Sequence, residues 1–265
     1  MSTVNLLSID WDYFFDINSD AERMECFQPI CTEDYSIDGI MFAWCACYAK
    51  YEDKLKKIKL VPESQRIISS IPASAVVHVC KSHRHAYEIF NRYVKRQDKV
   101  NLLNIDHHPD TVLPFNDKEP VHCGNWLSHF MNKHNTKGNV YKWLAHTDFR
   151  GQCPDSLQLV NIDDSGIDST PWNIVVIARS DIWSPPHLDG MFTELFKPIV
   201  TGRKSKGSVE AGVWKSRYDN GMKDVITMLQ QPVIDNPAIK EMYLEYLNLV
   251  SQIKRRELKV CFKVD

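Results

Sequence analysis

Short runs of apolar residues alternate along the chain with stretches of helical periodicity. Apolar runs of roughly four to eight residues, rich in Val and Ile, are typical of buried strands. Five such runs occur, at Val4–Ile9, Ala75–Val79, Val100–Ile105, Val140–Ala145 and Asn173–Ala178. The helical patterns lie at Ile37–Tyr51, Ser64–Ser70, His85–Arg96, Asn125–Asn132 and His187–Leu195. Strands that alternate with helices favour a parallel sheet with helices on both faces. The pattern therefore predicts an α/β fold of three layers, α/β/α, around a mainly parallel sheet.

The C-terminal part of the chain has a different pattern. Gly202–Gly221 contains the basic run Arg203–Lys206 and few apolar residues, which predicts a long loop. A solvated surface loop and a substrate lid both fit that composition. Further on, Ala238–Lys254 carries an apolar stripe at helical spacing, which we expect to face a core. No boundary is strong enough to divide the chain, so we expect a single domain over residues 1–265.

Composition and charge exclude several classes of protein. The 265 residues, of which 43% are hydrophobic, suit one large domain, and the formal net charge of -2 provides no general attraction to nucleic acid. No apolar run reaches the roughly 20 residues of a membrane helix, and the N-terminus does not resemble a secretion signal. The eight cysteines are scattered, without paired CxxC units, and are expected to be reduced thiols. We expect a cytoplasmic protein with no nucleic-acid or membrane partner, whose oligomeric state the sequence does not define.

Clusters of polar residues follow the predicted strands, where a parallel sheet places its ligand site. The strongest is a D-x-H-x-D motif, formed by Asp106, His108 and Asp110 directly after Val100–Ile105. Carboxylates and imidazoles at one strand end are suitable ligands for divalent metals. The alternative is a polar turn with aspartates that cap a helix. Burying these carboxylates together without a cation would be costly, which favours the metal interpretation.

Two further groups follow neighbouring strands. Asp10 and Asp12 form a D-x-D motif after Val4–Ile9, and residues two apart on a strand point to the same face. His83 and His85 lie just past Ala75–Val79, whereas His78 lies inside that run and is more typical of a packed residue. Each group alone is a weak signal. All of them at one sheet edge predict a metal centre.

In combination these motifs resemble the arginase and ureohydrolase superfamily, whose fold also serves histone deacetylases. The resemblance covers roughly residues 1–190 and is most detailed for the peptide arginases of ribosomal peptide natural-product pathways. The stretches that carry it are Lys81-Ser82-His83, Asp106-His107-His108-Pro109-Asp110, Gly124-Asn125-Trp126 and Ile177-Ala178-Arg179-Ser180. One departure is that the D-x-D strand stands first here, whereas arginases place it late. A permuted chain can nevertheless build the same sheet.

The resemblance implies two manganese ions and a role for each motif residue. His83 and Asp110 would bind one ion, His108 and Asp12 the other, and Asp106 and Asp10 would bridge them, with His85 as the substitute for His83. A carboxylate-rich site with one imidazole per ion suits manganese, with zinc or iron as alternatives. The site residues implied are thus Asp10, Asp12, His83, Asp106, His108 and Asp110 as metal ligands.

The resemblance also implies a reaction, the hydrolysis of an arginine side chain in a precursor peptide to ornithine and urea. Paired cations lower the pKa of bound water to about 7, which supplies the nucleophile. His122 would carry a proton to the leaving amine, or would instead only cap the helix that starts near Asn125. Asp181 would bind the guanidinium and assist catalysis, or would instead cap a turn before Ser184. Asn125, in the same family motif as Trp126, is a second predicted substrate-binding residue.

Other functions remain open at this point. A deacetylase would share the fold but normally uses one zinc ion, and Asp12 as a sixth ligand favours two metals. A ureohydrolase of free arginine or agmatine would need groups for the substrate's own charged ends, and no convincing pair of such groups is evident. A metal-binding protein without catalysis would bind metal tightly and release no urea.

Overall fold

The computed structural model describes residues 2–17, 51, 53–55, 57–112, 120–146, 153–180, 183–185 and 188–200. Several predictions lie outside these residues. They are the helix over Ile37–Tyr51, of which only Tyr51 is described, the loop Gly202–Gly221, the helix Ala238–Lys254 and the guanidinium-binding role of Asp181.

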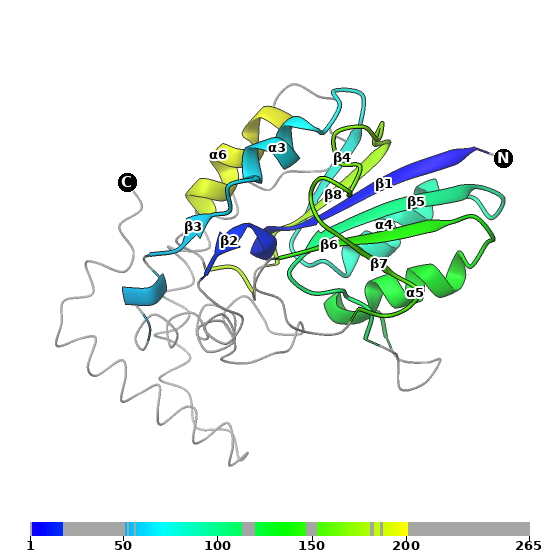
Figure 1. Cartoon of the computed structure of the whole chain (residues 1–265), viewed down its shortest axis with the longest axis horizontal. Helices are drawn as coiled ribbons and strands as arrows, with labels where there is room; N and C mark the ends of the chain where they lie inside the picture. Colours follow the sequence, from blue (N-terminus) through cyan, green and yellow to red (C-terminus); the bar gives the residue numbers. More distant parts are fainter. Residues whose placement is uncertain are drawn as a thin grey trace, which may run out of the picture.

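A six-stranded sheet forms the centre of the described part (Figure 1). Its strands are β1 (Thr3–Asp10), β4 (Val76–Cys80), β5 (Lys99–Asp106), β6 (Val140–Ala145), β7 (Gln158–Val160) and β8 (Ile174–Ala178). They lie in the order β4-β8-β1-β5-β6-β7, and each pairing is parallel. The predicted α/β class with a mainly parallel sheet is therefore confirmed. Because β1 pairs with β5 on one side and β8 on the other, the N-terminal strand is central to the sheet.

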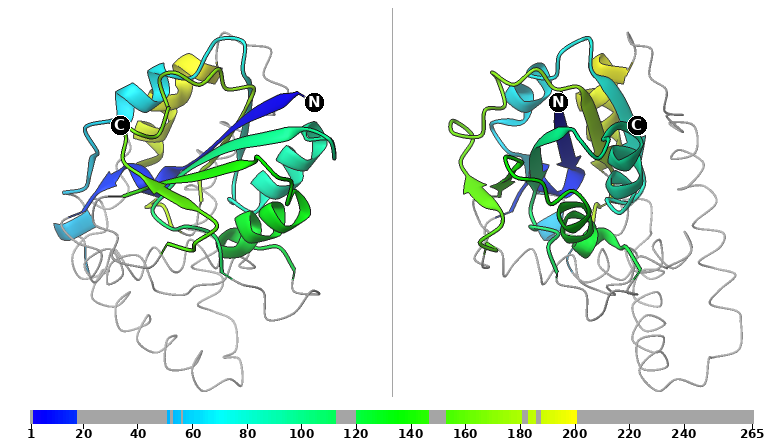
Figure 2. Two further views of the ribbon diagram at one scale, coloured as in Figure 1. Left: turned by 45° about the vertical axis from the view of Figure 1, so that its right-hand side comes forward. Right: turned by 90° about the vertical axis from the view of Figure 1, so that its right-hand side faces the viewer.

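Helices lie on both faces of this sheet. The helices α3 (Ser64–Ser69) and α6 (Asp189–Val200) lie side by side, and α4 (His85–Tyr93) lies beside α5 (Trp126–Lys133), as Figures 1 and 2 show from different directions. Leu7 and Ile9 of β1 belong to the core that includes residues of α3 and α6, whereas Leu6 belongs to the core of α4 and α5. This alternation follows from the two-residue period of a strand. It places Ser8 and Asp10 on the same face as Leu6.

The predicted elements differ from the observed ones mainly at their ends. The helix predicted to end at Leu195 continues as α6 to Val200, through Pro198, and its residues Phe196 and Ile199 are buried in the core. The short strand β7 was not predicted, and neither was the antiparallel pair of β2 (Phe15–Asp16) and β3 (Lys59–Leu60). Among the described helices, none combines the length and apolar character that crossing a membrane requires.

Candidate metal centre

The carboxyl ends of three sheet strands bring together the side chains that the motifs predict. Asp10 is the last residue of β1, Asp106 is the last residue of β5, and His83 lies between β4 and α4. Asp12 lies in the short 3-10 helix η1 (Trp11–Phe14) that follows β1, and it donates its backbone N–H to an Asp10 carboxylate oxygen at 3.2 Å. This turn directs the chain away from the sheet immediately after the first ligand candidate.

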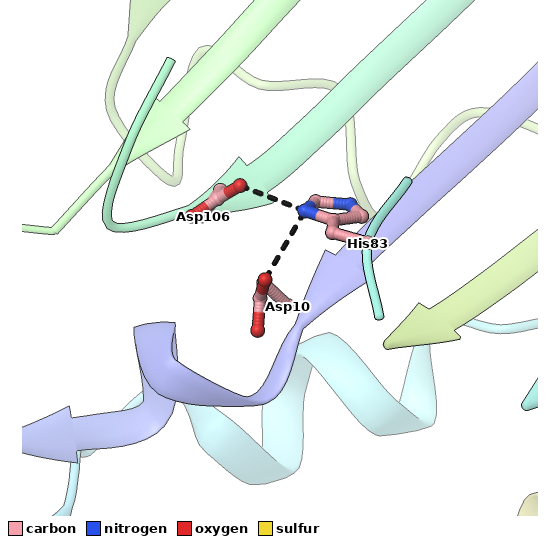
Figure 3. Close-up of side chains that lie close together, drawn as sticks. All are labelled: Asp10, His83 and Asp106. Carbon is pink, nitrogen blue, oxygen red and sulfur yellow. Dashed lines mark ion pairs between the residues drawn. The ribbon is translucent and has the colours of Figure 1, made fainter. Parts of the chain in front are cut away.

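His83 is surrounded by three carboxylates. Its Nδ1 atom lies 3.1 Å from Asp10 Oδ2, 2.9 Å from Asp106 Oδ2 and 2.9 Å from Asp110 Oδ2. Figure 3 shows Asp10 and Asp106 directed toward the ring from two neighbouring strands. The imidazole is fully buried, and within the described residues Nδ1 makes no well-aligned hydrogen bond with any of these oxygens. A buried nitrogen without such a bond calls for a partner, and a cation held among these carboxylates would supply one.

A second group of ligand atoms shares Asp106 with the first. His108 Nδ1 lies 3.6 Å from Asp12 Oδ2 and 4.0 Å from Asp106 Oδ1. The two oxygens of Asp106 therefore face two different histidines. The group of Asp10, His83 and Asp106, and that of Asp12, Asp106 and His108, each hold their ligand atoms within 4.8 Å of one another. Of the two histidines, His108 is the accessible one, with 33% of its side chain exposed.

Neighbouring polar groups hold these carboxylates and rings in place. Ser180 donates its hydroxyl to Asp10 Oδ2 at 2.5 Å, and the Trp126 indole N–H donates to Asp110 Oδ2 at 2.5 Å. The hydroxyl of Ser8 lies 2.5 Å from His83 Nε2. The sequence pattern did not single out Ser8 for any role, and it gave Trp126 and Ser180 none of their own. The signal for Ser8 was its position two residues before Asp10 on the same strand.

The backbone at the centre adopts an uncommon conformation at two non-glycine residues. Asp110 has a φ of 52° and Ser180 a φ of 50°, in the left-handed region that most side chains avoid. Both residues contact the cluster directly, since Asp110 faces His83 and Ser180 faces Asp10. Strained backbone of this kind is concentrated at functional sites. The surrounding structure therefore stabilises these two turns in the conformation that brings their side chains to the cluster.

Burial shifts the protonation of this cluster in a consistent direction. Desolvation raises the pKa of Asp106 from its ordinary 3.8 to about 8, and the charge of Asp110 adds to the effect. Desolvation also raises the pKa of Asp110. Burial alone would lower the pKa of His83, but the carboxylates of Asp10, Asp106 and Asp110 outweigh it and raise that pKa well above 6.5. The cluster thus retains protons at neutral pH when no cation is bound to it.

The donor set fits a divalent metal. The residues Asp10, Asp12, Asp106 and Asp110 are 5% exposed or less, and this concentration of buried negative charge needs a compensating cation or protons. Carboxylate oxygens with imidazole nitrogens are the ligand types of divalent ions such as manganese, zinc or iron. These buried Asp and His groups could therefore hold a metal ion.

The remaining predicted residues have other surroundings or are not described. His85 is the first residue of α4 and belongs to neither ligand group. His83, in contrast, belongs to the group with Asp10 and Asp106. His122 Nδ1 accepts the backbone N–H of Gly124 at 3.2 Å, and the Asn125 side-chain oxygen accepts the His122 N–H at 2.7 Å. These bonds form a capping box at the 3-10 helix η2 (Cys123–Asn125), the structural alternative raised for His122. The catalytic role of His122 and the substrate role of Asn125 stay predictions.

Comparison of the chain with protein-family models, with curated proteins and with solved structures gave no match. The resemblance to the arginase superfamily therefore depends on the motifs alone. The fold and the Asp/His cluster are independent of that resemblance.

Proposed function

We propose that this protein is a hydrolase that uses two divalent metal ions, preferably manganese, to remove urea from arginine side chains in a peptide. The observation that carries the proposal is the position of Asp106. One of its oxygens lies 2.9 Å from His83 Nδ1 and the other lies 4.0 Å from His108 Nδ1. A single carboxylate that faces two histidines with different oxygens is suited to bridge two cations.

The metals and the chain would divide the work. When bound, the ions would lower the pKa of a water molecule and make the reacting carbon more electrophilic. His83, Asp10 and Asp110 would hold one ion, and Asp12 and His108 the other, with Asp106 and Asp10 shared. Ser180 and Trp126 fix the Asp10 and Asp110 carboxylates by hydrogen bonds, so the ligands are organised before a metal binds. This arrangement lowers the reorganisation that metal binding requires.

The substrate part of the proposal is based on chemistry and on the family resemblance. A peptidyl arginine and one water molecule would give peptidyl ornithine and urea, with the positive charge passing from the guanidinium to the new ammonium. Asp181 would bind the guanidinium, and His122 would supply the proton that the leaving amine needs. His108, the exposed member of the cluster, lies with its ring centroid 5.4 Å from that of Trp183. We expect the substrate to approach from this side.

The test is mass spectrometry of arginine-containing peptides after incubation with the manganese-loaded protein. Conversion of arginine to ornithine removes a CN₂H₂ unit, and urea is measured in the same sample. The Asp106→Ala variant serves as the inactive control, and free arginine is offered in parallel. Release of urea from the peptide by the wild type, without release by Asp106→Ala, supports the proposal. A higher kcat/KM for free arginine overturns the peptide substrate, and deacetylation of an acetyl-lysine peptide without urea overturns the reaction class.

A further inference from the structure

The two ring nitrogens of His83 face different groups on different sides of the ring. Nδ1 faces the carboxylates of Asp10, Asp106 and Asp110, whereas Nε2 lies 2.5 Å from the hydroxyl oxygen of Ser8. Both Ser8 and His83 are fully buried. Bulk solvent therefore does not reach the contact with Ser8, and a flip of the ring by 180° would lose the contacts on both sides.

The position of Ser8 follows from the strand. Ser8 and Asp10 are two residues apart on β1, so their side chains leave the same face of the sheet. His83 approaches that face from the connection between β4 and α4. One strand thus contacts both nitrogens of the same ring, with Asp10 at Nδ1 and Ser8 at Nε2.

Metal binding imposes a choice of tautomer on this ring. A neutral imidazole carries one proton, and the nitrogen that binds a metal must be the one without it. If Nδ1 binds the metal, the proton must reside on Nε2, where the Ser8 hydroxyl oxygen can accept it. Ligand histidines commonly donate their second N–H to such a partner, which fixes both tautomer and ring orientation.

We infer that Ser8 is a positioning residue for the metal centre, which holds His83 in the tautomer and orientation that present Nδ1 to the metal. The inference rests on the proposed metal-binding function and adds to it a residue that no motif singled out. His108 shows the contrast, because its Nε2 lies 3.4 Å from His107 Nδ1, a longer and weaker contact. The contacts at Nε2 therefore fix the orientation of the two candidate ligand rings to different degrees.

Metal affinity provides the first test. Manganese binding is titrated calorimetrically into the wild-type protein, Ser8→Ala and Ser64→Ala. Ser64 is the matched control, a buried serine at the start of α3 whose hydroxyl donates to a backbone carbonyl away from the cluster. Loss of a partner of a ligand histidine is expected to weaken metal affinity by roughly 10–100-fold. Ser8→Ala should show this loss, and Ser64→Ala should bind like the wild type.

The tautomer provides the second test, with a readout that a general loss of stability would not change. With diamagnetic Zn²⁺ in place of manganese, ¹⁵N NMR of the His83 ring should show Nε2 protonated in the wild type. Ser8→Thr, which retains the hydroxyl, should preserve the protonated Nε2 and the wild-type metal affinity. If Ser8→Ala does not fold, Ser8→Cys takes its place. Wild-type affinity in Ser8→Ala, or a proton on Nδ1 in the zinc-loaded wild type, overturns the inference about Ser8 and leaves the proposed function standing. Absence of metal binding in the wild type overturns the proposed function as well.

Discussion

Asp106 is the residue on which the chemistry of the cluster depends most. Its carboxylate is 1% exposed and is a member of both groups of ligand atoms. Burial and the nearby Asp110 raise its pKa to about 8. In the absence of metal, this side chain holds a proton through most of the physiological range, and a bound cation would displace that proton.

This shift predicts how the stability of the metal-free protein depends on pH. A group whose pKa is raised in the folded state stabilises that state at low pH, and the stabilisation is lost as pH rises through the folded pKa. The pKa of Asp106 is raised from 3.8 to about 8 and that of His83 well above 6.5, so both act in the same direction. The melting temperature of metal-free protein should fall between about pH 5 and pH 8.

The control for this prediction is Asp106→Asn, whose side chain does not titrate. Its melting temperature should fall less steeply than that of the wild type over the same range. Added manganese should raise the wild-type melting temperature more at pH 8 than at pH 6, because fewer protons then compete for the ligands. Equal slopes for the two metal-free proteins would contradict the assigned pKa of Asp106.

His122 offers a separate prediction, because its capping role and its catalytic role can be divided by mutation. Its Nδ1 atom accepts the Gly124 N–H as a helix cap. Asparagine is also a good cap but cannot transfer a proton near neutral pH. We expect His122→Asn to keep the wild-type melting temperature and metal content while its kcat falls by roughly 10²–10⁴-fold.

The comparison with His122→Ala completes this test. The alanine variant should lose the same activity and, in addition, about 1 kcal/mol of stability from the missing cap. Wild-type turnover in His122→Asn would show that capping is the only role of this residue. Loss of metal in either variant would show that His122 contributes to the metal centre itself.

At the scale of elements, the two ligand groups come from different kinds of structure. Asp10 and Asp106 end the central strands β1 and β5, whereas Asp12 lies in η1 and His108 follows β5. His83 is fully buried and is surrounded by three carboxylates, whereas 33% of the His108 side chain is exposed. Electrostatic attraction is stronger where solvent is excluded, so the His83 group should bind its cation more tightly.

The expected result is a titration with two steps, separated by at least about tenfold in dissociation constant. His108→Ala should remove the weaker step and leave the tighter one. His78→Ala is the control, because the His78 ring contacts Tyr93 rather than the cluster. A His108→Ala protein that loses both steps equally would mean that the two groups bind metal as one unit.

How far the elements could be predicted depended on burial. The strands β1, β5 and β8 were identified from their apolar runs, because a parallel sheet with two covered faces buries apolar residues on both sides of each strand. Only β8 is apolar throughout, whereas β1 and β5 also carry polar residues such as Ser8 and Asn104. The edge strand β7 was missed, since Gln158 and Leu159 are exposed and its three residues carry no such pattern. The pair of β2 and β3 was missed for a similar reason, because each has two residues and an exposed polar position.

The candidate site was predicted to the extent that it follows from strand ends. Asp10 and Asp106 converge because β1 and β5 are parallel neighbours, a consequence of the sheet that the sequence pattern already indicated. The contact of Ser180 with Asp10 joins residues 170 positions apart and depends on the left-handed turn at Ser180, which no local pattern predicts. The contact of Trp126 with Asp110 likewise requires the position of α5 on the sheet.

At the scale of the whole molecule, the described part of the sheet packs against apolar cores and carries polar residues where β1 and β5 end. Two apolar cores lie on its opposite faces, and the buried Asp/His cluster lies where β1 and β5 end. A parallel α/β sheet places its ligand site at this end of its strands. The fold therefore places Asp10 and Asp106 on strand ends, and His83, Asp12 and His108 in the segments that follow strands.

The central claim is that this end of the sheet holds two metal ions with Asp106 between them. Elemental analysis of the protein after dialysis against manganese, with Asp12→Ala and Asp106→Ala measured in parallel, tests it most directly. We expect close to two ions per chain in the wild type, about one in Asp12→Ala, and fewer than one in Asp106→Ala. A value of one ion per wild-type chain that Asp12→Ala leaves unchanged would contradict the two-metal account.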